Sequence, residues 1–155
     1  EREVQRELAR IKRYPADGSL VFLDIDGFKQ VNDTFGHAAG DRALLQLASA
    51  LTKDIRSVDI VGRYGGEEFV LLLPGTSLEA ARAVAQLCLD GIEALALPHA
   101  GSCTASALTV SIGVASMLPV AGADPSMLVD AADAALYRAK KEGRNQFGLQ
   151  PEAAA

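Results

Sequence analysis

An apolar segment, Leu20–Ile25, limits the possible folds more than any other part of the chain. It is interrupted only by Asp24 and is followed directly by Asp26 and Gly27. An apolar run of this length, bounded by turn-forming residues, is typical of a buried strand rather than a helix. We therefore expect a buried strand that ends in a loop carrying acidic residues.

Helical patterns recur in the rest of the chain. A charged amphipathic stretch, 1–13, predicts a linker helix that precedes a single domain, 14–149, with 150–155 as a tail. Thr76 and Glu79 have the spacing of a capping box, in which Thr76 would cap the helix that follows. The helices expected within the domain are 40–55, 76–96 and 124–143.

Further strands are expected at three places. Ile60–Leu73 has the pattern of two strands joined around Gly65 and Gly66, because a Gly-Gly pair supplies the positive φ angles of a tight hairpin. Alternation of apolar with polar or small residues predicts a half-buried strand over 108–114, and 145–149 is expected to add a short last strand. A hairpin combined with strands separated by helices predicts an α/β (α+β) domain with one mixed sheet of about five strands.

Charge and composition exclude several classes of function. The 155 residues include 20 acidic and 15 basic side chains, for a formal net charge of −5, so no general cationic field exists to hold DNA. No apolar run approaches the roughly 20 residues that span a membrane. Two cysteines and no visible signal peptide favour a reducing, cytoplasmic location. Phosphate-binding loops of the GxxxxGK[ST] type, GxGxxG motifs and GxSxG elbows are absent.

Carboxylates follow two of the expected strands. Asp24 and Asp26 lie at the end of the first strand, and Glu67 and Glu68 lie just after the hairpin turn. If these strands are neighbours, the acids meet at one edge of the sheet, where they repel unless a cation lies between them. Oxygen-only ligands suit Mg²⁺. Each acid alone is better explained as a solvated loop residue, whereas Asp24 and Glu67 together favour a metal site.

Cations and polar side chains accompany these acids. Lys29 follows the first strand, and Lys140 and Arg144 are four residues apart at the end of the last expected helix, where they would share one face. Alone they are ordinary solvated charges, but with Mg²⁺ they are suited to neutralise a triphosphate. Asn32 and Asp41 are suited to reading the edge of a base, and equally to capping helices.

Arg63–Phe69, which reads RYGGEEF, resembles the signature of GGDEF-domain diguanylate cyclases in its GGEEF variant. The resemblance extends in the same order over almost the whole chain, through the blocks Asp24–Lys29, Asn32-Asp33, Gly36-His37, Gly40-Asp41, Ser111–Gly113, Ala132–Tyr137 and Ala139–Asn145. It implies a palm-like domain of the nucleotidyl-cyclase type. The implied reaction condenses two GTP into cyclic di-GMP with release of two pyrophosphates.

The resemblance also implies a metal site and a catalytic base. Asp24, the backbone carbonyl of Ile25 and Glu67 would bind Mg²⁺ or Mn²⁺, and Glu68 would add negative charge nearby. Glu67 would accept the proton of the attacking 3′-hydroxyl. Lys29 would stabilise the transition state.

The remaining implied contacts are with the nucleotide. Backbone N–H groups at Phe28 and its neighbours would bind the terminal phosphates, together with the side chains of Lys29, Lys140 and Arg144. The guanine base would be read by Asn32 and Asp41, with His37 close by.

Assembly and control follow from the same resemblance. Because one domain holds one GTP, two domains would face each other as a homodimer during catalysis. Arg56 and Asp59 resemble an RxxD product-inhibition site, although the pair alone is more simply a salt bridge at a helix end. An upstream sensory or receiver domain is also implied. The alternative is a non-catalytic domain that senses cyclic di-GMP or GTP.

Overall fold

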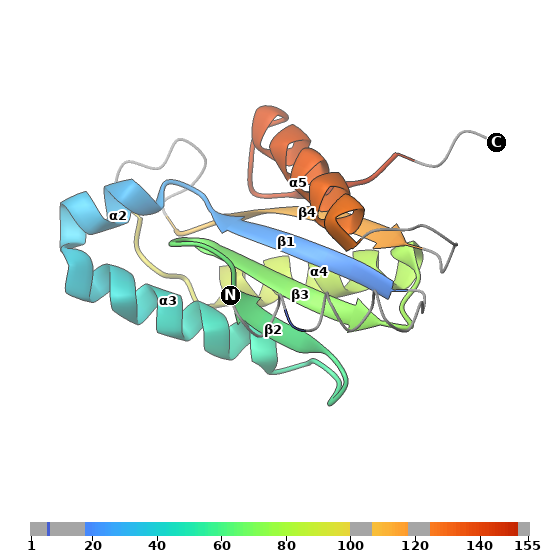
Figure 1. The fold of residues 1–155 in the computed structure, drawn as a ribbon. Coiled ribbons are helices and arrows are strands. Elements are labelled where there is room, and N and C mark those ends of the chain that lie inside the picture. Colours follow the sequence, from blue (N-terminus) through green and yellow to red (C-terminus); the bar gives the residue numbers. More distant parts are fainter. Residues whose placement is uncertain (1–5, 7–17, 100–106, 118–124, 152–155) are drawn as a thin grey trace.

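The computed structural model describes residues 6, 18–99, 107–117 and 125–151. Its centre is a five-stranded sheet in the order β2-β3-β1-β4-β5 (Figure 1). The strands are β1 (Gly18–Ile25), β2 (Ile60–Arg63), β3 (Glu68–Pro74), β4 (Val110–Met117) and β5 (Phe147–Leu149). β1 pairs antiparallel with both β3 and β4, and β5 pairs parallel with β4. The expected mixed sheet of five strands is confirmed.

Helices cover both faces of this sheet. Within the described residues they are α2 (Phe28–Phe35), α3 (His37–Thr52), α4 (Leu78–Ala94) and α5 (Pro125–Lys141). Figure 1 shows α5 crossing one face, α3 and α4 lying on the other, and α2 following the end of β1. None of the helices in the described residues is long and apolar enough to cross a membrane.

The central strand β1 is buried on both sides, because its alternate residues enter two different apolar cores. Leu20 and Phe22 face α5, whereas Val21, Leu23 and Ile25 pack with residues of α3 and α4. A continuous apolar run is what such a strand requires. Burial on both sides of β1 therefore explains why the segment Leu20–Ile25 is almost entirely apolar.

β4 corrects the expectation of a half-buried strand. Its first six residues are all buried, including the polar and small positions Ser111, Gly113 and Ala115. A Cβ at Gly113 would overlap with the backbone of α5 at Ala132 and Leu136. The alternation of large and small residues therefore reflects the close approach of a helix to one face, not exposure to water.

The helices also differ from the predictions in three respects. α3 begins at His37 rather than at residue 40, and α2 was not expected at all. α2 is only eight residues long and buries only Phe28 and Val31, so its apolar residues are too few to predict a helix. Ser77, not Thr76, is the N-cap of α4, with its side chain accepting a hydrogen bond from the backbone N–H of Ala80 at 3.2 Å.

The turn between β2 and β3 differs from the predicted tight hairpin. Neither Gly65 nor Gly66 has a positive φ angle. The backbone N–H groups of Tyr64 and Gly65 both donate to the carbonyl of Glu68, at 2.8 and 3.3 Å. Arg63 closes this longer loop by donating to the carbonyls of Gly65 and Gly66, at 3.1 and 2.7 Å. Apart from Arg6, the expected linker helix 1–13 lies outside the described residues.

Candidate active site

The acids of two distant segments meet at one edge of the sheet. Asp24 at the end of β1 is the register partner of Glu68 at the start of β3, and the backbone N–H of Ile25 donates to the carbonyl of Glu67 at 3.2 Å. Burial raises the pKa of Glu67, and the negative charge of Asp24 raises it further. The pairing of β1 with β3 thus brings the segments that carry Asp24 and Glu67 side by side.

Asp24 has one paired and one unpaired carboxylate oxygen. Its side chain lies on the α5 side of the sheet, and Oδ2 forms an ion pair with the ammonium group of Lys140 on α5. The other oxygen, Oδ1, is buried and has no hydrogen-bond partner among the described residues. A buried anionic oxygen without a donor is an unfavourable arrangement unless another ligand completes it.

The donor set at this edge fits a hard divalent cation. Asp24 Oδ1 and the Glu67 carboxylate are oxygen ligands of the type that Mg²⁺ prefers. The described residues contain no group of three or more His, Cys, Asp or Glu side chains that would hold a metal alone. The chain therefore suits an ion that keeps water or takes substrate oxygens for its remaining positions. The backbone carbonyl of Ile25 is the third protein ligand that the sequence analysis expects.

Glu68 lies beside this pair. Burial raises its pKa, the charge of Asp24 raises it further, and the nearby Lys140 acts in the opposite direction. Lys140 forms an ion pair with Asp24 and offsets its negative charge in this structure. To bind a phosphate as expected, the ammonium group of Lys140 must contact Asp24 and the phosphate together, or leave Asp24 for the phosphate.

Asp26 does not belong to the acidic pair, although it is only two residues from Asp24. It is 4% exposed and accepts hydrogen bonds from the hydroxyls of Thr109 and Ser111, both at 2.7 Å. It also accepts the backbone N–H of Asn145 at 3.1 Å. Asp26 therefore ties the end of β1 to β4 and to the loop after α5, which is a structural role.

The end of α5 corrects the expectation that Lys140 and Arg144 share a helical face. α5 ends at Lys141, and three left-handed residues follow it: Gly143, Arg144 and Asn145, with φ angles of 124°, 64° and 50°. Arg144 is exposed in this turn, and its backbone N–H donates to the carbonyl of Ala139 at 3.0 Å. The turn places the backbone of Asn145 against Asp26.

α2 and α3 carry the residues expected to contact the nucleotide. Phe28 is buried at the start of α2, the side chain of Lys29 is exposed, and His37 is exposed at the start of α3. A Cβ at Gly40 would overlap with the end of the Asn32 side chain, so Asn32 occupies the space that the missing side chain of Gly40 leaves between α2 and α3. This contact brings Asn32 next to the turn of α3 that carries Asp41.

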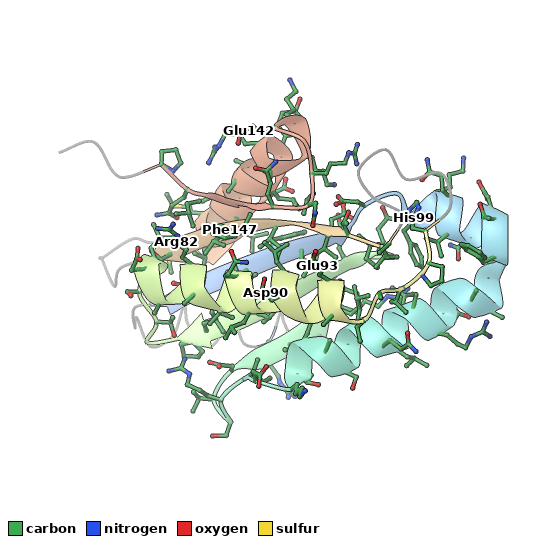
Figure 2. The ribbon with its side chains drawn as sticks, turned by 180° about the vertical axis from the view of Figure 1, so that it is seen from behind. Arg82, Asp90, Glu93, His99, Glu142 and Phe147 are labelled. Carbon is green, nitrogen blue, oxygen red and sulfur yellow. The ribbon has the colours of Figure 1, made fainter. Side chains whose placement is uncertain are left out.

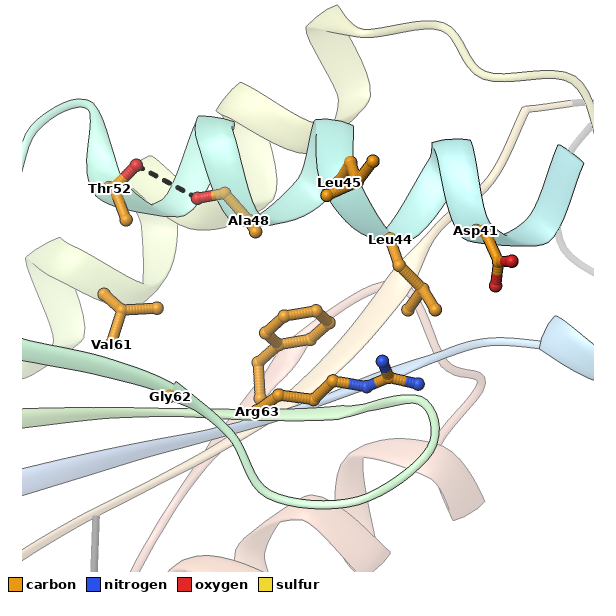
Figure 3. A pocket seen from close by; sticks show the side chains of 9 residues that line it. Asp41, Leu44, Leu45, Ala48, Thr52, Val61, Gly62 and Arg63 are labelled. Atoms are coloured by element: carbon orange, nitrogen blue, oxygen red, sulfur yellow. Dashed lines mark hydrogen bonds between the residues drawn. The ribbon is translucent and has the colours of Figure 1, made fainter. Parts of the chain in front are cut away.

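A cavity of about 420 Å³ lies between α3 and β2 (Figure 3). Apolar side chains form most of its wall, with Asp41 and Arg63 as the charged members. Its lining consists of Asp41, Leu44, Leu45, Ala48, Thr52, Val61, Gly62, Arg63 and Phe69. Asp41 is the residue of this lining that was expected to read a base, whereas no site role was expected for Leu44 or Arg63. Two features of the sequence could have indicated Leu44 and Arg63 as lining residues: the apolar face of the helix that carries Leu44, and the position of Arg63 beside the Gly65-Gly66 turn.

Arg56 and Asp59 lie apart from the acidic edge. The guanidinium of Arg56 forms an ion pair with Asp59 at 2.7 Å and donates to Thr76 Oγ1 at 2.7 Å and to the carbonyl of Pro74 at 3.0 Å. Pro74 ends β3 and Glu68 begins it. Seven residues of strand separate the two sites by about 20 Å.

The fold and the acidic edge together define a class: a mixed α/β domain whose two neighbouring central strands carry carboxylates at the same edge of the sheet. A family model described as "Diguanylate cyclase, GGDEF domain" matches residues 1–146. The chain belongs to this family.

Relatives agree with this assignment. The probable diguanylate cyclase DgcC of Escherichia coli K12 is 38% identical over 92% of this chain and 38% of its own length. Diguanylate cyclase DgcP of Pseudomonas aeruginosa is 42% identical over 93% of this chain and 21% of its own. The chain thus spans well under half the length of these curated relatives.

Solved structures match over nearly the whole chain. The active GGEEF domain of a diguanylate cyclase from Vibrio cholerae has a TM-score of 0.81 and 31% identity, covering 99% of this chain and 97% of that one. The GGDEF domain of DgcB from Caulobacter crescentus in complex with c-di-GMP also has a TM-score of 0.81 and 31% identity, with 96% and 86% coverage. The fold expected for a GGDEF domain is confirmed.

Proposed function

We propose that this domain is a diguanylate cyclase that condenses two GTP into cyclic di-GMP and releases two pyrophosphates. The observation that carries the proposal is the strand pairing that sets Asp24 beside the segment Glu67-Glu68, with Asp24 Oδ1 buried and unpaired among the described residues. Membership of the GGDEF family supports it. A bound Mg²⁺ or Mn²⁺ would supply positive charge that offsets the negative charge of the phosphates.

Glu67 is the proposed proton acceptor. In each half-reaction a 3′-oxygen forms a bond to the α-phosphorus of the other GTP, the bond to pyrophosphate breaks, and the hydroxyl proton must leave. A carboxylate whose pKa is raised is a stronger base than an ordinary one, and burial beside Asp24 raises the pKa of Glu67. Glu68 adds negative charge that keeps the site selective for cations.

Binding and orientation of the triphosphate are assigned to the surrounding cations and backbone. Lys29 is free to turn its exposed side chain towards the phosphates and to stabilise the transition state. Lys140 lies next to Asp24, and Arg144 follows the same helix, so both approach from the α5 side. The backbone N–H groups at Phe28 and its neighbours begin α2, where a helix N-terminus favours phosphate.

The guanine base is proposed to enter the cavity between α3 and β2. Its apolar wall suits a flat ring, and the carboxylate of Asp41 accepts hydrogen bonds from a base edge. Asn32 lies against Gly40, one residue before Asp41, and His37 begins the same helix. These three polar residues are the proposed readers of the base.

Two further properties belong to the proposal. Each domain holds one GTP, so two copies must face each other and the rate should rise with more than the first power of protein concentration. Arg56 and Asp59 are the proposed product-inhibition site, separate from catalysis, where a planar guanidinium would bind a guanine edge or phosphate. A cytoplasmic location and an upstream sensory or receiver domain stay predictions.

Product analysis tests the proposal. The purified chain is incubated with GTP and Mg²⁺ over a dilution series, and nucleotides are separated by chromatography. We expect cyclic di-GMP and pyrophosphate in a 1:2 ratio, and loss of about 100-fold or more in Glu67→Gln, the usual scale for removing a general base. Glu142→Gln, at an exposed glutamate beyond α5, is the matched control and should keep full activity.

The alternative function predicts a different result. A non-catalytic sensor would bind GTP or cyclic di-GMP by calorimetry and form no product at any protein concentration. Folded protein that gives this outcome would overturn the cyclase assignment. Loss of product binding in Arg56→Ala with retained turnover would assign inhibition to the Arg56 site, whereas unchanged inhibition would remove it from that site.

A further inference from the structure

His99 is a buried polar residue to which the proposed function gives no role. It lies in the segment that leads from α4 towards β4, is 2% exposed, and stands beside α2 (Figure 2). Its Nε2 atom is 2.9 Å from the backbone carbonyl oxygen of Gly27, 72 residues earlier in the chain. The contact therefore joins a late segment of the chain to the loop between β1 and α2.

The two residues fit each other closely. Gly27 has a φ angle of 64°, and a Cβ built on it would lie 2.8 Å from His99 Nε2. Atoms that are not bonded to each other are strongly repelled at this separation. A side chain at position 27 and the imidazole in its present place therefore exclude each other, and the missing side chain of Gly27 makes room for His99.

The hydrogen bond also fixes which ring nitrogen carries the proton. A carbonyl oxygen only accepts, so Nε2 must be the donor. The other nitrogen, Nδ1, is buried and has no partner among the described residues. The same carbonyl of Gly27 accepts the backbone N–H of Gln30 at 3.0 Å and that of Val31 at 3.4 Å. Donors from the first turn of α2 and from a distant segment thus converge on one oxygen.

This convergence sets the direction of the next backbone N–H. The peptide group between Gly27 and Phe28 is planar and trans, so the N–H of Phe28 points opposite to the carbonyl that His99 holds. Phe28 begins α2, where the first N–H groups have no partner within the helix, and no side chain caps this end. The orientation of that N–H is therefore controlled from the far side of the peptide.

We propose that His99 is a positioning residue that holds the Phe28 N–H towards the terminal phosphates of bound GTP. The inference rests on the proposed function, because the phosphates belong to the proposed substrate. His99 itself does not touch the nucleotide; it acts through the carbonyl of Gly27.

Three variants of the full chain test the inference. His99→Ala removes the donor, and His99→Gln keeps a side-chain N–H that can reach the carbonyl of Gly27. Glu93→Gln is the control at an exposed position of α4. Calorimetry with a non-hydrolysable GTP analogue and Mg²⁺ should show binding weakened about tenfold in His99→Ala, the size of one charge-assisted hydrogen bond. His99→Gln and the control should stay within about twofold, and binding of GMP, which lacks the terminal phosphates, should be unchanged.

A spectroscopic measurement supplies a second readout that needs no nucleotide. The ¹⁵N shifts of the His99 ring in the unaltered protein should show a protonated Nε2 and a bare Nδ1. The opposite tautomer would overturn the inference even if His99→Ala fails to fold. In folded variants, unchanged binding of the analogue by His99→Ala, or equal losses for the analogue and GMP, would overturn it as well. Protein that binds the analogue with the expected pattern but makes no cyclic di-GMP would refute the proposed function and leave this inference supported.

Discussion

Two aspartates that are two residues apart should respond to substitution in opposite ways. Asp26 is enclosed by donors from β4 and from the loop after α5, whereas Asp24 has an unpaired oxygen and one partly exposed partner, Lys140. We expect Asp26→Ala to lower the stability of the fold strongly. We expect Asp24→Asn to leave the fold intact and to abolish cyclase activity.

The magnitudes follow from the contacts that each change removes. Asp26→Ala leaves the buried hydroxyls of Thr109 and Ser111 and the backbone N–H of Asn145 without their acceptor. Each such group costs about 1–3 kcal/mol, and the relief of a buried carboxylate offsets part of the sum, so the free energy of unfolding should fall by about 3–5 kcal/mol. Asp24→Asn removes an ion pair whose lysine is about one-third exposed and also removes repulsion with Glu67, so a change within about 1 kcal/mol is expected.

Thermal and urea unfolding followed by circular dichroism measure both changes, with EDTA present so that no metal contributes. For a chain of this size the Asp26→Ala loss corresponds to a fall in Tm of about 10 °C. Asp24→Ala and Asp26→Asn complete a matched set of four variants. A Tm of Asp26→Ala within about 2 °C of the unaltered protein, or an equal fall for Asp24→Asn, would refute the division of the two aspartates into structural and functional roles.

Further outcomes are expected at two glycines, one cysteine and one glutamate. Gly113→Ala should lower the free energy of unfolding by several kcal/mol or prevent folding, because its Cβ would overlap with the backbone of α5. Gly91→Ala on α4, where a Cβ meets open space, should raise the free energy of unfolding by about 0.5–1 kcal/mol, as measured by urea unfolding. Burial raises the pKa of the Cys88 thiol to about 12, so stability should fall as pH rises from the ordinary thiol range towards that value. In a Cys103→Ser background Cys88 should react with a thiol reagent at pH 8 only after unfolding, and rapid labelling of native protein would contradict this. Glu67→Gln should raise Tm in EDTA, because Asp24 then no longer faces a like charge; a clear fall would show that Glu67 supports the fold.

The strands were predictable because they depend on local patterns, whereas the meeting of their acids was predicted only on the condition that the two strands are neighbours. The apolar run of β1 and the two strands around Gly65-Gly66 were readable from the chain, and neighbouring antiparallel strands bring Asp24 and Glu68 into register. The tight-turn geometry was not readable. The loop is closed by the Arg63 side chain, which contacts backbone carbonyls and requires no positive φ angle.

The second helix was missed because its stability is not local. α2 has two buried residues and begins after a left-handed glycine, Gly27, without a side-chain cap. Eight residues of this kind form a marginal helix in isolation, so their structure depends on packing against α3. In that packing the Asn32 side chain lies against Gly40 of α3, and a contact between two helices cannot be predicted from the spacing of residues within one of them.

The loop after β1 also explains why the spacing of Asp24 and Asp26 could not show that the two aspartates have different roles. In a continuing strand Asp24 and Asp26 would face the same side, but β1 ends at Ile25 and the chain turns at Gly27. The loop is then held from outside: Asp26 by β4 and the segment after α5, Gly27 by His99, and Asp24 by Lys140. All of these partners lie more than 70 residues later in the chain. The geometry of the acidic edge is therefore imposed by the completed fold, and the segments after α4 determine the shape of a site whose acids come from β1 and the start of β3.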